Sequence, residues 1–125
     1  MGSVMNVAKK RILAECPAQI AMEVLGGKWK GLIIFHVSDG TKRFCELQRL
    51  IPRVSQRMLS KHLRELEADG IVRRKVHGEV PPRVEYSLTE FGKTLNPILD
   101  ALHGWGQTYL EHFNEESSEP VSQIG

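Results

Sequence analysis

The chain has 125 residues, 41% of them hydrophobic and 26% charged, with 17 lysines and arginines against 15 aspartates and glutamates. This length suits one domain with one core, and no stretch approaches the roughly 20 consecutive apolar residues of a membrane helix. Cys16 and Cys45 lie far apart without a CxxC pair, which argues against a disulfide scaffold or a zinc finger. The first residues lack the apolar core of a secretory signal, so we expect a cytoplasmic protein.

Glycine and proline divide the first half of the chain into short helices. Residues 1–15 are expected to form an N-terminal arm or a short helix. Proline is favoured at the first position of a helix, so Pro17 marks a helix start, and glycine or proline ends each of the segments that follow. The predicted helices are Pro17–Leu25, Lys28–Val37 and Arg43–Leu50.

Residues 55–69 show the clearest helical pattern in the sequence. Ser55 is a favourable N-cap, and Gly70 suits the left-handed position that follows a helix. Leucines recur on one stripe and basic side chains on the opposite one. Because an amphipathic helix turns its apolar stripe to the core, the cations should face solvent together. These cations are Arg57, Lys61 and Arg64.

Two strands follow this helix. Apolar and polar residues alternate in Arg83–Leu88, the period of two that marks a half-buried strand, and Val72–Val76 is expected to pair with it. The connection between them, residues 77–82, contains two prolines. We expect it to project as a rigid tip.

The end of the chain predicts one long helix and a tail. Thr89 is an N-cap candidate for a helix that ends near Phe113, and Pro97 should kink or split it. The tail, residues 114–125, is rich in glutamate and serine and is expected to be disordered. Residues 16–113 therefore form the predicted domain.

Charge is distributed unevenly along the chain. Residues 41–83 hold eleven lysines and arginines against five acidic residues, whereas residues 84–125 hold one against seven. A basic middle followed by an acidic end suggests a segment that binds a polyanion, joined to one that stays away from it. A basic surface that is merely solvated is the alternative interpretation.

The order of the elements predicts an α+β, mainly helical fold of the winged helix-turn-helix type. Residues 43–50 would be the supporting helix, residues 55–69 the recognition helix and residues 77–83 the wing. A helix fits the major groove of B-DNA, where Gln, Arg and Ser read base edges. Arg83, with Lys75 or Arg74 as further candidates, suits the adjacent minor groove, whose negative potential attracts arginine.

Several short motifs occur together along this order of elements. They are Gly-Lys-Trp at 27–29, Arg43-Phe44, Ser55 with Met58-Leu59, Leu63 with Leu66, and Pro82-Arg83-Val84-Glu85-Tyr86. With them, the chain from about Cys16 to Tyr109 resembles the HxlR-type winged-helix regulators, relatives of the MarR group. The resemblance implies a bacterial or archaeal transcription factor that binds an operator as a homodimer, with N- and C-terminal dimerisation helices.

The final helix favours a dimer independently, because its stripe is more apolar than a small domain easily covers. The candidate interface residues are Ile98, Leu102, Trp105 and Tyr109. The alternative is that this stripe packs only against its own domain. Two recognition helices in successive major grooves would require a roughly palindromic double-stranded operator.

The candidate DNA-binding residues lie at the start of the supporting helix, on the recognition helix, on the strand that follows it and on the wing. They are Lys42, Arg43, Ser55, Gln56, Arg57, Ser60, Lys61, Arg64, Arg74, Lys75 and Arg83. Repression by blocking a promoter is the simplest mode of action. A winged-helix module that binds another protein, without sequence-specific DNA binding, is the alternative function, because a fold does not fix a function.

Cys16 is the candidate redox sensor. It directly precedes Pro17 and should therefore occupy the N-cap of a helix, where partial positive charge favours a thiolate. A cysteine at this place resembles the redox- or electrophile-sensing thiol of some family members. In those proteins an oxidant acts as the inducer: oxidation links two subunits or attaches a small thiol, and DNA affinity changes. The alternative is a small apolar residue in the dimer interface.

Nothing in the sequence indicates an enzyme. There is no nucleophile elbow, phosphate loop or HExxH pattern, so we expect no catalytic residue, metal or cofactor. The five histidines are not paired with cysteine at metal-ligand spacing, and His36 and His62 are expected at the edge of the core. Cys45 is expected to pack.

Overall fold

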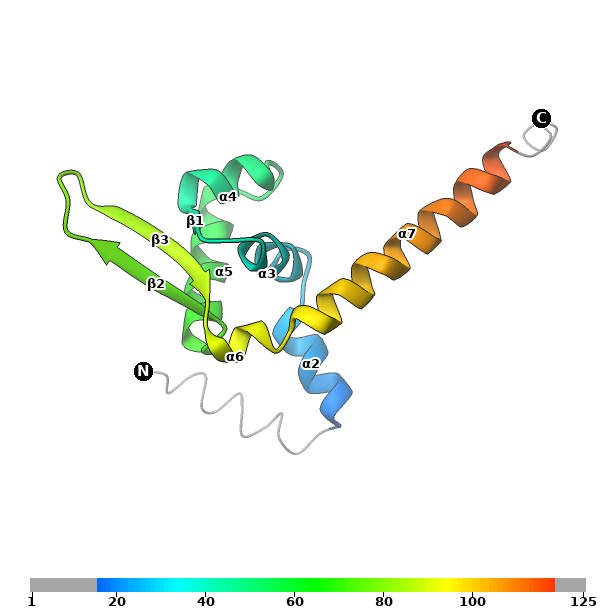
Figure 1. Cartoon of the computed structure of the whole chain (residues 1–125), viewed down its shortest axis with the longest axis horizontal. Helices are drawn as coiled ribbons and strands as arrows, with labels where there is room; N and C mark the ends of the chain where they lie inside the picture. Colours follow the sequence, from blue (N-terminus) through cyan, green and yellow to red (C-terminus); the bar gives the residue numbers. More distant parts are fainter. Residues whose placement is uncertain (1–15, 119–125) are drawn as a thin grey trace. The chain divides into compact units, whose positions relative to one another are not determined.

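The computed structural model describes residues 16–118, with side chains as far as residue 115 (Figure 1). The predicted N-terminal arm lies outside these residues. The helices are α2 (Pro17–Leu25), α3 (Lys30–Ser38), α4 (Phe44–Leu50), α5 (Gln56–Ala68), α6 (Glu90–Lys93) and α7 (Asn96–Ser118), and the strands are β1 (Lys42–Arg43), β2 (Val72–His77) and β3 (Arg83–Leu88). The chain divides into two compact units after Thr94.

The core of the first unit forms where the leucine stripe of α5 meets the apolar residues of α3, α4 and β2. Its largest fully buried side chains are Ile33, Ile34, Leu47, Leu59, Leu63, Leu66 and Val72. Burying each such side chain contributes about 1.5–3 kcal/mol to folding. This burial fixes which side of α5 is left to face solvent.

Both ends of α5 are capped as the sequence predicts. The Ser55 hydroxyl accepts a hydrogen bond from the Met58 N–H at 3.1 Å. At the other end Gly70 has a positive φ of 77°, and the N–H of Ile71 donates to the carbonyl of Leu66 at 2.9 Å. This is the Schellman arrangement, in which glycine avoids the penalty that a side chain would incur at positive φ.

The sheet is antiparallel, with strand order β1-β3-β2. Glu85 in β3 lies opposite Arg43 on one side and Lys75 on the other, while Tyr86 points to the opposite face and is buried. Strand β1 was not predicted. Its two residues are too few to show the periodicity of a strand, so the sequence placed Arg43 in the supporting helix. That helix begins instead at Phe44. Helices dominate around this small sheet, so the predicted α+β winged helix-turn-helix is confirmed.

The predicted long final helix is split into α6 and α7. Thr89 caps α6, with its Oγ1 accepting the N–H of Gly92 at 2.8 Å. Pro97 lies in the first turn of α7, where its missing N–H costs nothing. Helix α7 continues to Ser118 rather than ending near Phe113, so the predicted tail begins too early, and the remainder of that tail lies outside the described residues. No helix in residues 16–118 is long and apolar enough to cross a membrane.

Candidate nucleic-acid interface

The solvent face of α5 carries the basic side chains that the sequence predicted there. Arg57, Lys61 and Arg64 are all exposed, opposite the buried leucine stripe. Gln56 is exposed beside them, and Ser60 is half-buried. One side of α5 therefore presents guanidinium, ammonium, amide and hydroxyl groups, which are the groups that bind phosphates and base edges in a major groove.

A charged cluster around Glu65 ties α5 to α3. The carboxylate lies 3.0 Å from Lys30 Nζ, 3.3 Å from His62 Nδ1 and 3.9 Å from Lys61 Nζ. Partial burial on its own raises the pKa of Glu65. The hydrogen bonds and charges of these neighbours outweigh burial and hold that pKa below its usual value. The ionised carboxylate therefore fastens the recognition helix to its neighbour.

In the structure the wing is the whole hairpin of β2, β3 and the loop that joins them, which is longer than the predicted residues 77–83. A hollow of about 310 Å³ opens between α5 and this wing. It is lined by Ser60, Arg64, Glu67, Arg74 and Tyr86. Arg64 Nη1 donates a hydrogen bond to Ser60 Oγ at 3.0 Å. The sequence singled out the two arginines and the serine. It missed the other two residues, because only the packing of α5 on β2 and the pairing of β2 with β3 bring them together.

Arg83 of the wing is held by two carboxylates. Its Nη2 lies 3.1 Å from Glu79 Oε2, and its Nε lies 3.6 Å from Glu85 Oε2. His77 Nε2 is hydrogen-bonded to Glu85 at 2.8 Å, and this bond, aided by the charge of Arg83, holds the pKa of Glu85 below its usual value. The prediction that Arg83 serves the minor groove did not foresee these acidic partners on the same hairpin.

The edge strand β2 presents three consecutive cations, Arg73, Arg74 and Lys75, all exposed. Side chains alternate along a strand, so Arg74 lies on the α5 side together with Tyr86, whereas its two neighbours lie on the other side. Arg73 was absent from the sequence-based set. The strand therefore divides its positive charge between the hollow and the outer face of the wing.

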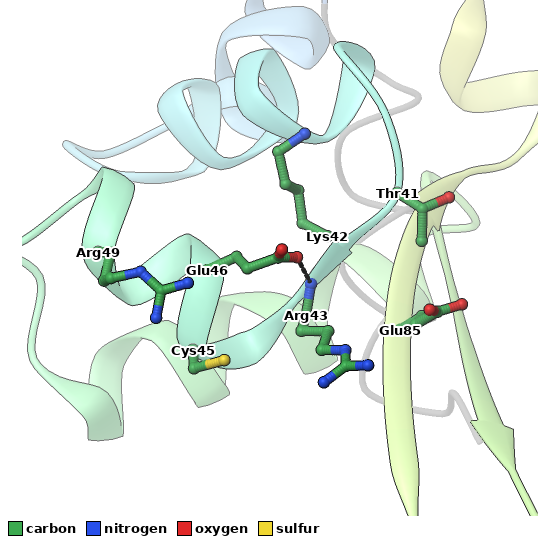
Figure 2. Close-up of a pocket in the computed structure, with 7 residues that line it drawn as sticks. All are labelled: Thr41, Lys42, Arg43, Cys45, Glu46, Arg49 and Glu85. Atoms are coloured by element: carbon green, nitrogen blue, oxygen red, sulfur yellow. Dashed lines mark hydrogen bonds between the residues drawn. The ribbon is translucent and has the colours of Figure 1, made fainter.

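A second hollow, of about 400 Å³, lies between the start of α4 and β3 (Figure 2). It is lined by Thr41, Lys42, Arg43, Cys45, Glu46, Arg49 and Glu85. The Glu46 carboxylate accepts the backbone N–H of Arg43 at 2.7 Å and so caps α4. The expectation that Cys45 packs is wrong, because its side chain is exposed and lines this surface hollow. Arg49 is a further cation that the sequence analysis missed.

Cys16 occupies the predicted position directly before α2. Its backbone carbonyl accepts the N–H of Gln19 at 3.0 Å, and its side chain makes no capping hydrogen bond. The thiol is free and exposed. Within the described part of the chain, no group of three histidine, cysteine or acidic side chains is arranged to hold a metal ion.

Helix α7, taken by itself, carries the predicted apolar stripe on an exposed side. The exposed fractions are 44% for Ile98, 55% for Leu102, 64% for Trp105 and 49% for Tyr109. The Trp105 and Tyr109 rings lie 5.3 Å apart, and the next ring along the stripe, Phe113, lies 4.7 Å from Tyr109. An apolar stripe exposed to this degree is suited to packing against a second helix.

Comparison with known proteins gives one consistent result. The profile of HxlR-like helix-turn-helix proteins matches residues 24–114. The HTH-type transcriptional regulator YybR of Bacillus subtilis is 56% identical over 93 residues, which are 74% of each chain. The solved structure of the redox regulator HypR in its reduced form is similar, with 51% identity, a TM-score of 0.76, and coverage of 80% of this chain and 99% of that one. The reduced form of the regulator YodB from B. subtilis is 42% identical, with a TM-score of 0.67 and coverage of 76% and 94%. This chain belongs to the family of HxlR-like helix-turn-helix proteins.

Proposed function

We propose that this protein is a sequence-specific DNA-binding transcriptional regulator that acts in the cytoplasm as a homodimer, with repression as its simplest mode. The observation that carries the proposal is the solvent-facing basic side of α5, held on a buried leucine stripe beside a basic wing. Relatives named as transcriptional regulators support it. In this arrangement α5 enters the major groove and the wing reaches the adjacent minor groove.

The start of α5 is the part suited to reading bases, because the first residues of a recognition helix lie closest to base edges. Arg57 offers the paired donors that match guanine, and Gln56 offers the donor and acceptor that match adenine. Ser55 lies at the same end of the helix. Lys42 and Arg43, at the start of the supporting helix, are suited to backbone phosphates, as is Lys75 on the outer face of the wing.

The test of this assignment is a paired charge deletion. Arg57→Ala together with Lys61→Ala should weaken binding to a selected operator at least about 30-fold, because each charged contact to DNA is worth about 1–3 kcal/mol. Lys28→Ala with Lys93→Ala removes the same charge away from α5 and should leave affinity nearly unchanged. Binding to a genomic fragment library first identifies the operator. A folded α5 variant that binds like the control would show that the face is wrongly assigned.

Salt dependence separates this function from that of a protein-interaction module. Binding that neutralises several phosphates weakens steeply with salt, with a log–log slope of about −0.9 for each phosphate. A protein–protein contact of ordinary charge content weakens less. Measuring the affinity at two salt concentrations therefore decides between them, and the abundance of unpaired basic side chains on α5 and β2 favours the steep slope.

The homodimer is proposed to form through the stripe of α7, together with the first helices. Two copies would place two recognition helices on a roughly palindromic operator. Leu102→Asp puts a charge in the middle of the stripe and should produce monomers in sedimentation experiments. Gln107→Asp adds the same charge on the opposite side of the helix and should leave the dimer intact. Equal behaviour of the two variants would refute the interface.

We also propose that thiol oxidation at Cys16 changes DNA affinity. The thiol is exposed and has no capping partner, and the similar structures include proteins named as redox regulators. Cys16→Ser should bind DNA as the wild type does but lose the response to diamide. Cys45→Ser, which alters the other exposed thiol, is the matched control and should keep that response. An unchanged response in Cys16→Ser would remove this residue as the sensor.

A further inference from the structure

The hollow between α5 and the wing is the place where the two DNA-facing elements meet. Ser60, Arg64 and Glu67 line it from α5, and Arg74 and Tyr86 line it from the strands. Tyr86 is almost fully buried and Arg74 is exposed. The hollow therefore opens to solvent, with a buried tyrosine in its lining and a basic rim.

The two arginines at this rim have no acidic partner. Among the described residues, neither Arg64 nor Arg74 forms an ion pair, in contrast to Arg83. Arg64 donates one hydrogen bond to Ser60, and this bond restricts the position of its guanidinium group. Most of its five N–H donors remain available. A guanidinium group held by Ser60 and a second, exposed guanidinium group lining the same hollow are suited to an oxyanion, which arginine binds through paired hydrogen bonds.

The path of the DNA supplies that oxyanion. If α5 occupies a major groove and the wing the neighbouring minor groove, the sugar-phosphate strand that separates the two grooves has to cross the junction of α5 and the wing. We propose that the hollow binds one phosphodiester group of this strand through Arg64 and Arg74. This inference rests on the proposed DNA-binding function and assigns one phosphodiester group to two arginines that the sequence placed only among the candidate DNA-binding residues.

A phosphate contact predicts a particular energetic pattern. It positions the protein on the duplex without reading a base, so its loss should weaken specific and non-specific binding alike. Glu67 lines the same hollow and would repel the phosphate. Neutralising it should therefore strengthen binding to every sequence, a gain that damage to the fold does not produce.

The experiment compares Arg74 with a lysine that lies outside α5 and the wing. Arg74→Gln should weaken binding about tenfold, both to the operator and to a scrambled duplex, and should lower the log–log salt slope by about one. Lys28→Gln removes the same charge from an exposed position outside α5 and the wing and should change affinity by less than about twofold, as expected for an exposed charge that makes no direct contact. Glu67→Gln should raise affinity on both duplexes. Thermal unfolding confirms that each variant is folded.

A scan of operators with single methylphosphonate groups identifies the phosphate. At one position, neutralising the phosphate should remove the difference between wild type and Arg74→Gln. The proposal is overturned if Arg74→Gln behaves like Lys28→Gln, if it loses discrimination between the two duplexes, or if no position removes the difference. Failure of the wild type to bind any duplex would instead overturn the DNA-binding function itself.

Discussion

Gly92 lies where a side chain has no room. A Cβ atom built on it would collide with the carbonyl oxygen of Ile71 and would lie 3.2 Å from Leu88 Cδ2. That carbonyl is not free to move, because it accepts the N–H of Thr89 at 3.0 Å. Gly92→Ala must therefore displace the backbone at the point where the wing begins.

The cost follows from this geometry. Forcing a methyl group into a packed site costs about 1–3 kcal/mol, and weakening the hydrogen bond to Thr89 adds about 1 kcal/mol. The higher helix propensity of alanine offsets less than about 1 kcal/mol of this cost, since α6 is a short helix. We expect Gly92→Ala to lower the free energy of unfolding by about 2–3 kcal/mol, which shifts Tm by about 10 °C in a domain of this size.

Denaturant and thermal unfolding at a fixed protein concentration measure this effect, since the Tm of a dimer depends on concentration. Gly31→Ala is the control, because its added Cβ would meet only an ordinary contact 3.9 Å from the Leu25 carbonyl oxygen. It should be neutral or slightly stabilising. If Gly92→Ala changed stability by less than about 0.5 kcal/mol, the close approach to Ile71 would not exist in solution, since a tolerated surface substitution has effects of that size.

Two further predictions concern α5. Ser55→Ala removes the hydroxyl that accepts the Met58 N–H and should destabilise the protein by about 1 kcal/mol in chemical denaturation, whereas Ser55→Asp should retain the cap. Because the folded state lowers the pKa of Glu65, this carboxylate stabilises the fold above its unfolded pKa, near 4.5, and loses that contribution as the pH falls through its folded pKa. Glu65→Gln should therefore be less stable than wild type at pH 7, by about 1 kcal/mol at most for so exposed a group. The difference between the two proteins should begin to shrink near pH 4.5 and vanish once the pH is below the folded pKa of Glu65, and a constant difference would contradict the role of the Lys30 contact.

Local patterns predicted those elements whose signals lie within a few residues. The stripe and caps of α5 are all encoded between Ser55 and Ile71, so its limits and its exposed face were predictable. Strand β1 was not, because it exists only through pairing with β3. The break next to Pro97, between Lys93 and Asn96, was expected as a kink or split, but the continuation of α7 to Ser118 was not predicted, since a polar composition alone does not end a helix.

In the candidate site, too, features with a local sequence signal were predictable, and features that depend on tertiary contacts were not. The cations of α5 follow from one helical period, and their exposure follows from the leucines opposite. The ion pairs of Arg83 and the membership of Glu67 and Tyr86 in the hollow depend on which side chains meet across strands and between elements. Cys45 shows the same limit of sequence-based prediction. It follows Phe44 and resembles a core residue in the sequence, but its side chain is exposed to solvent.

The recognition helix, the wing and α6 share a junction that fixes their spacing. Thr89 Oγ1 donates to the carbonyl of Gly70 at the end of α5 and accepts the N–H of Gly92 in α6, while the Thr89 N–H donates to Ile71 at the start of the wing. Simultaneous contact with a major and a minor groove requires that α5 and the wing keep a set separation, because positional errors of an ångström forfeit charge-assisted hydrogen bonds. A side chain at Gly92 strains this junction, so Gly92→Ala should weaken DNA binding more than its residual folded fraction explains. Gly31→Ala, which leaves the junction intact, should not.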